Sequence, residues 1–180
     1  MMDYILLTGI WGGLITVLGG AYPEERGHPI YSTKNWLLAM GALILLGYAA
    51  LNYFFGGGSL FFVMLELLII VASVMMMLDV DDKTDAIVLS IIGLGFVIWS
   101  FFLYEGLSTI YFIIGLTGVA LGYALKTGTV QRFLAFTLGS VLLTAFSYLG
   151  ADWVFFGLNA FFSVFSAFYL IRILRISYKK

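Results

Sequence analysis

The sequence contains no cysteine, one histidine and two prolines among its 180 residues, and only 11% of its residues are charged. Without cysteine, the chain cannot form disulfides, thiolate zinc sites or iron–sulfur clusters, and it cannot use a thiol in catalysis. A net charge of −1 argues against a nucleic-acid partner. The sequence also offers no serine–histidine–acid set, no cluster of metal ligands and no phosphate-binding loop. We therefore expect neither an enzyme nor a protein with a bound cofactor or metal ion.

Hydrophobic residues, in contrast, make up 62% of the chain. A soluble domain has roughly 45–50% apolar and about 25% charged residues, so the excess apolar surface predicts a lipid bilayer as the surrounding solvent. A membrane-spanning helix needs about 20 mostly apolar residues. Seven segments meet this requirement, and short connections rich in glycine, proline or charge separate them. The predicted spans are residues 4–22, 36–55, 59–78, 86–104, 108–125, 131–149 and 153–174.

The distribution of charge gives an independent test of this number. If seven spans alternate in direction, all nine lysines and arginines fall on one side of the membrane. The residues concerned are Arg26, Lys34, Lys83, Lys126, Arg132, Arg172, Arg175, Lys179 and Lys180. The opposite side carries only Asp3, Glu105 and Asp152. Because basic residues are retained in the cytoplasm, we predict a protein of the cell (inner or plasma) membrane with its N-terminus outside and its C-terminus inside.

Three pairs of segments can be aligned within the sequence, which indicates an internal repeat. The aligned pairs are Gly9 with Gly115, Gly12 with Gly118, Gly41 with Gly139, Glu66 with Asn159, and Ser73 with Ser166. We therefore predict an all-α transmembrane fold of 3+1+3 helices, in which a linker helix joins two parallel three-helix repeats. The predicted divisions are residues 1–80, the linker 81–106, and residues 107–180. Chance similarity between apolar helices is the alternative explanation.

The second half also carries motifs found in a known group. They are Gly115-x-x-Gly118, Gly122-Tyr123-Ala124-Leu125, Gly139-Ser140, and then Trp153 and Asn159. With these motifs the chain resembles the SWEET, semiSWEET and PQ-loop proteins, in particular small bacterial permease-like members. Vitamin transporters of the nicotinamide riboside type and the KDEL receptor share this plan. The resemblance implies the 3+1+3 arrangement and places paired solute-contacting residues at Glu66 and Asn159, but such a fold does not select a solute.

Glu66 is the only acidic residue deep within an apolar segment. A charged carboxylate there costs at least ~2.5 kcal/mol on insertion scales, so we expect it to face the protein interior, where it binds solute or couples transport to protons. A protonated carboxyl that hydrogen-bonds a neighbouring helix is the alternative. Asn159 has the same two interpretations, solute contact or a hydrogen bond between helices.

Five further residues are weaker candidates. Tyr48, Asn52 and Trp11 could contact solute, because an aromatic ring beside a polar group suits a sugar or a heterocycle. Ser73 and Ser166 could line a path or form a gate, although small residues also allow helices to pack closely.

From these observations we expect a small transporter or facilitator of a small polar, sugar- or vitamin-like solute, working by alternating access between two three-helix bundles. The competing hypothesis is a receptor, assembly subunit or scaffold that keeps the fold without transporting. Seven helices can act as a monomer, and a homo-oligomer is the alternative.

Overall fold

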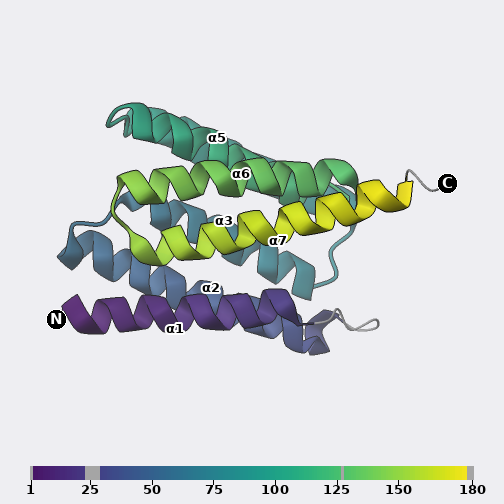
Figure 1. Cartoon of the computed structure of the whole chain (residues 1–180), viewed down its shortest axis with the longest axis horizontal. Coiled ribbons are helices and arrows are strands. Elements are labelled where there is room, and N and C mark those ends of the chain that lie inside the picture. Colours follow the sequence, from purple (N-terminus) through teal and green to yellow (C-terminus); the bar gives the residue numbers. More distant parts are fainter. Residues whose placement is uncertain (1, 23–28, 127, 178–180) are drawn as a thin grey trace. The chain divides into compact units, whose positions relative to one another are not determined.

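The computed structural model describes residues 2–22, 29–126 and 128–177. Within these ranges the chain is helical, and its seven long helices confirm the predicted all-α class (Figure 1). The helices are α1 (Met2–Ala21), α2 (Thr33–Leu51), α3 (Leu60–Met77), α4 (Asp82–Phe102), α5 (Leu107–Ala124), α6 (Val130–Leu149) and α7 (Trp153–Ser177). A 3-10 turn, η1 (Pro29–Tyr31), precedes α2, and a π-helical turn, η2 (Asn52–Gly56), extends it.

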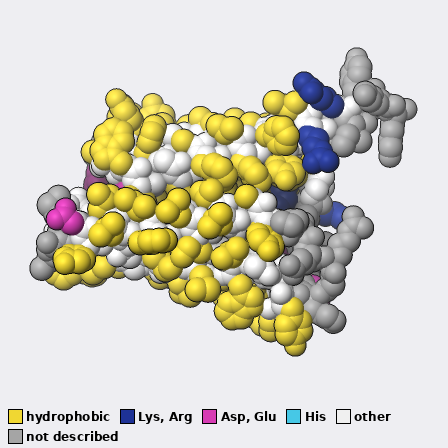
Figure 2. All heavy atoms as spheres, turned by 60° about the horizontal axis from the view of Figure 1, so that its bottom comes forward, with side chains coloured by type: hydrophobic (Ala, Val, Ile, Leu, Met, Phe, Trp, Pro, Cys, Tyr) yellow, Lys and Arg dark blue, Asp and Glu magenta, His cyan; other side chains and the backbone are white. Residues whose placement is uncertain are grey.

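All seven helices are long and apolar enough to cross a membrane by length and composition. Many large hydrophobic side chains lie exposed along them, and on the face drawn in Figure 2 such side chains cover most of the helical surface. Soluble proteins rarely expose apolar patches of this extent. The chain is therefore a multi-pass α-helical membrane protein.

The chain divides into two compact units, Met1–Asp81 (unit 1) and Asp82–Lys180 (unit 2), and each unit is described by itself. α4, the predicted linker helix, packs against α5 within unit 2. The assignment of residues 81–106 as a linker between repeats remains a prediction.

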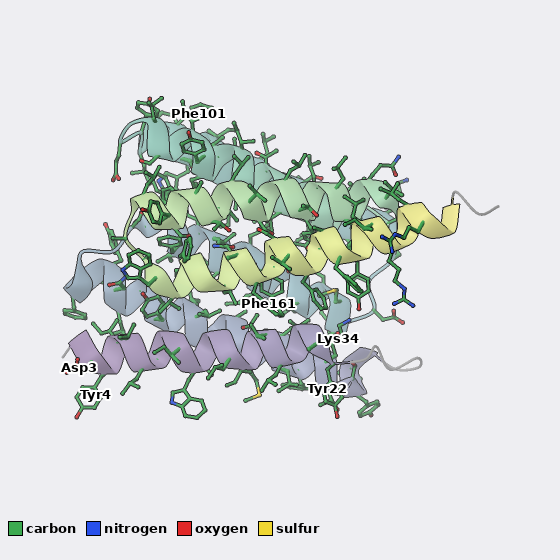
Figure 3. The ribbon with its side chains drawn as sticks, viewed as in Figure 1. Asp3, Tyr4, Tyr22, Lys34, Phe101 and Phe161 are labelled. Carbon is green, nitrogen blue, oxygen red and sulfur yellow. The ribbon has the colours of Figure 1, made fainter. Side chains whose placement is uncertain are left out.

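In unit 1, α1 and α2 form an antiparallel pair, and α3 packs on α2 (Figure 1). Asp3 lies at one end of α1, whereas Tyr22 and Lys34 lie at the other end of the pair (Figure 3). The connection to α3 reverses the chain at Gly57, whose φ of 76° favours glycine. Ser59 then begins α3, because its side chain accepts a hydrogen bond from the Phe61 N–H at 3.3 Å.

In unit 2 the four helices pack in chain order, α4 against α5, α5 against α6 and α6 against α7. Thr129 caps α6, its hydroxyl accepting from the Arg132 N–H at 3.3 Å. Arg132 Nη1 in turn donates to the Leu125 carbonyl at 3.0 Å, and its guanidinium lies over the Phe136 ring. The short α5–α6 connection is thus held at both of its ends.

Candidate functional site

α1 and α2 approach closely along a row of small residues. A Cβ atom added to Gly9 would lie 2.8 Å from the Tyr48 ring, and one added to Gly12 would lie 3.0 Å from the Leu45 backbone nitrogen. The contacts in this row are Gly9–Tyr48, Gly12–Leu45, Thr16–Gly41 and Gly19–Leu38. Small residues at such an interface let the two backbones come together, which is how helices associate in lipid.

α5 and α6 form a similar interface in unit 2. A Cβ atom added to Gly139 would lie 2.8 Å from both the Gly115 carbonyl oxygen and the Val119 nitrogen. The contacts in this row are Phe112–Phe146, Gly115–Leu143, Val119–Gly139 and Gly122–Phe136. The rings of Phe112 and Phe146 have their centroids 5.2 Å apart.

Glu66 lies on the buried face of α3, seven residues into the helix. Its side chain is 0% exposed, and neither carboxyl oxygen has a hydrogen-bond partner among the residues that the structure describes. Phe62, one turn before it, and Ser73, two turns after it, are buried on the same face. A buried polar group of this kind normally has a partner, so its lack of one needs an explanation.

Asn159, in α7 of unit 2, has the partner that Glu66 lacks. Its side chain is 7% exposed, and its Nδ2 donates a hydrogen bond to the Ser147 Oγ of α6 at 3.4 Å. The Ser147 hydroxyl donates in turn to the Leu143 carbonyl at 2.7 Å. This is the hydrogen bond between helices that the sequence offered as the alternative to solute contact.

Tyr48 and Asn52, two of the predicted solute contacts, are brought together in unit 1. Asn52 Nδ2 donates to the Tyr48 hydroxyl at 3.5 Å, at the point where α2 passes into η2. The Tyr48 side chain is buried against Gly9. Trp11 does not join them, because its side chain is 62% exposed on α1.

Ser73 and Ser166, the predicted path or gate residues, are both buried in their helices, α3 and α7. Their burial agrees with either interpretation of them. Among the described residues, no group of three or more histidine, aspartate or glutamate side chains could hold a metal ion.

Sequence reasoning missed two residues near these candidates. One is Ser147, because an isolated serine in an apolar helix gives no signal of its own in the sequence. Asp152 was counted only as a surface charge, yet it is 6% exposed and its Oδ1 accepts from the Phe155 N–H at 3.2 Å. Its position directly before α7 is typical of a helix N-cap, so the signal was present.

No protein-family model, curated protein or solved structure matches the chain. The fold and the site define an α-helical multi-pass membrane protein in which the fully buried Glu66 carboxyl group has no hydrogen-bond partner among the described residues.

Proposed function

We propose that this protein is a small membrane transporter or facilitator, which moves a small polar solute by alternating access. The observation that carries the proposal is Glu66, a fully buried carboxyl group in an apolar helix that has no hydrogen-bond partner in the described part of the chain. Ionisable groups inside membrane proteins are expensive and usually mark a path for a solute or an ion. A group serving only the fold would be expected to have a partner within the protein.

Many transporters that work by alternating access are built from two similar halves, and we infer that α1–α3 and α5–α7 are such repeats. The support is a matching series of contacts in the two helix pairs. The corresponding pairs are Gly9–Tyr48 and Phe112–Phe146, Gly12–Leu45 and Gly115–Leu143, Thr16–Gly41 and Val119–Gly139, and Gly19–Leu38 and Gly122–Phe136. In this series Gly12, rather than Gly9, corresponds to Gly115, which is a shift of about one helical turn from the alignment of the sequence alone.

The ends of the helices support the same correspondence. Equivalent ends are Ala21 and Ala124 for α1 and α5, Leu51 and Leu149 for α2 and α6, and Leu60 and Trp153 at the starts of α3 and α7. Ser59 and Asp152 each cap the start of a helix, α3 and α7 respectively. The Ser59 hydroxyl accepts from the N–H two residues further on, and the Asp152 carboxylate accepts from the N–H three residues further on. In this proposed correspondence Glu66 and Asn159 occupy equivalent positions in the two repeats.

The proposed orientation places the N-terminus outside and the C-terminus in the cytoplasm of the cell membrane. The described basic residues lie at helix ends that alternation puts on one side: Lys34, Lys83, Lys126, Arg132, Arg172 and Arg175. Arg26, Lys179 and Lys180 belong to the same predicted group but lie outside the described residues. The positive-inside rule makes this side cytoplasmic.

A second candidate is a receptor, assembly subunit or scaffold without transport. The Asn159–Ser147 hydrogen bond favours it, because this bond gives Asn159 a purely structural task. In the transport proposal, Asn159 supports the second repeat and Glu66 carries the function.

The test is uptake into proteoliposomes that contain the full-length protein. Radiolabelled sugars, nucleosides, vitamins and small amines are offered with and without a pH gradient. We expect saturable uptake of at least one class, and its loss in Glu66→Gln. Glu105→Gln is the matched control, because Glu105 is exposed in the α4–α5 connection. If no class is taken up by the wild-type protein, the non-transporting candidate replaces the proposal.

A further inference from the structure

Glu66 is the only aspartate, glutamate, lysine or arginine that is buried within a helix of the described chain. The other described charges lie in connections, in the first turns of helices or near the end of α7. A carboxylate inside a bilayer must be neutralised, and proteins usually do this with a nearby basic side chain. The neighbours of Glu66 therefore decide where its counter-charge comes from.

The elements of unit 1 that contact α3 do not supply a positive charge to Glu66. They are α2 and η1, and their titratable side chains are Lys34, Tyr48 and Tyr31. None of the three is hydrogen-bonded to Glu66. Lys34 lies in the first turn of α2, about 20 Å along the helix axis from the last turn that leads to α3. The Tyr48 hydroxyl accepts from Asn52, and Tyr31 is exposed.

In unit 2, the polar side chain at the equivalent position has a hydrogen-bond partner within the unit. There, Asn159 is satisfied by Ser147 of the preceding helix. In the correspondence between α2 and α6, the residue equivalent to Ser147 is Ala49, which is buried but carries no hydroxyl. Unit 1 thus has an acidic side chain at this position, and its α2 carries no hydroxyl at the position equivalent to Ser147.

We propose that the Glu66 carboxyl group takes up one positive charge from outside the chain, either a proton or the ammonium group of a small solute, and that unit 2 has no matching site. This inference rests on the proposed transport function and narrows its solute class to cations, or to solutes carried together with protons. A proton forms an O–H bond on one carboxylate oxygen and leaves the group neutral. An ammonium group donates its N–H hydrogens to the carboxylate oxygens, and no covalent bond changes.

Infrared difference spectroscopy on the detergent-solubilised full-length protein tests this inference. The C=O stretch of a protonated carboxylic acid is distinct from the bands of a carboxylate, and the difference between wild type and Glu66→Gln assigns the Glu66 signal. The signal is followed from mildly acidic to mildly alkaline pH, and then at fixed pH with ethylammonium chloride against sodium chloride. Glu105→Gln is the control that must leave the assigned band unchanged, and Glu66→Asp is a second variant that retains a carboxyl group with a shifted band.

A reversible loss of the acid band with rising pH identifies the proton as the charge. A conversion to carboxylate bands with ethylammonium, but not with sodium, identifies the ammonium group. An acid band that responds to neither pH nor ethylammonium overturns the inference, and so does a carboxylate that responds to neither. The infrared measurement does not depend on transport, so failure of the charge-site inference can be distinguished from failure of the transport proposal. A responding band without uptake in liposomes removes the transport proposal, whereas uptake of a neutral sugar with a fixed band removes the charge site alone.

Discussion

Asn159 donates a hydrogen bond from its Nδ2 to the Oγ of Ser147, 3.4 Å away, and so joins α7 to α6 inside unit 2. The two residues are 12 positions apart in the chain, on either side of a tight connection. Both side chains are buried. Within a membrane protein, such a bond contributes a modest but measurable stabilisation.

Ser147→Ala should lower the stability of the folded protein by about 0.6 kcal/mol, the average for hydrogen bonds between membrane helices, and by no more than about 1.7 kcal/mol. The physical reason is that the Asn159 amide loses its acceptor on α6. Thermal unfolding in detergent measures the change. Thr137→Ala is a matched control, because the Thr137 hydroxyl bonds the Phe133 carbonyl of its own helix at 2.7 Å. Equal losses in the two variants would show that the bond to Asn159 contributes nothing.

The seven helices could be predicted from the sequence because hydropathy and chain breaks are local signals. The predicted span 86–104, for example, corresponds to α4 (Asp82–Phe102). The burial of Glu66 could also be foreseen, because a charge in lipid is costly. The hydrogen-bond acceptor of Asn159 could not be predicted, because it depends on how α6 and α7 pack against each other. For the same reason the sequence did not reveal that Trp11 faces away from Tyr48.

Gly139→Ala should destabilise the protein by about 1 to 3 kcal/mol, the usual cost of overpacking. The added methyl group would press on backbone atoms of α5, which cannot rotate away, and would push the two helices apart. Gly157→Ala is the control in the same unit, because a Cβ atom there meets nothing within 4 Å. We expect that change to be neutral or to stabilise by about 0.5–1 kcal/mol, since alanine is the better helix former. A neutral Gly139→Ala would argue against the close approach of α5 and α6.

The absence of cysteine makes the proposed orientation simple to measure. Glu105→Cys and Lys126→Cys each place a single thiol at an exposed position, in the α4–α5 and α5–α6 connections respectively. With the N-terminus outside, a membrane-impermeant maleimide should label the cysteine at position 105 in intact cells. The cysteine at position 126 should react only after the cells are made permeable. The reverse pattern would contradict the orientation, and labelling of both in intact cells would contradict a membrane crossing by α5.

The correspondence between Ala49 and Ser147 can be tested by rebuilding the second unit's hydrogen bond in the first. The double variant Ala49→Ser, Glu66→Asn should restore a serine–asparagine pair between α2 and α3. The stability effect of Ala49→Ser is measured in a Glu66→Asn and in a Glu66→Leu background, because leucine, unlike glutamate, cannot bond the new hydroxyl. The difference between the two effects is the coupling free energy, which we expect to be about 0.5 kcal/mol or more in favour of the serine–asparagine pair. Ala42→Ser with Glu66→Asn is the control cycle, because Ala42 is buried on α2 two turns before Ala49. Coupling at Ala49 alone would establish that Glu66 occupies in unit 1 the position that Asn159 occupies in unit 2, and that α2 lacks the serine hydroxyl found on α6. Coupling at Ala42 instead, or at neither position, would mean that the two units are not packed in the proposed register, and that the missing partner of Glu66 has another cause.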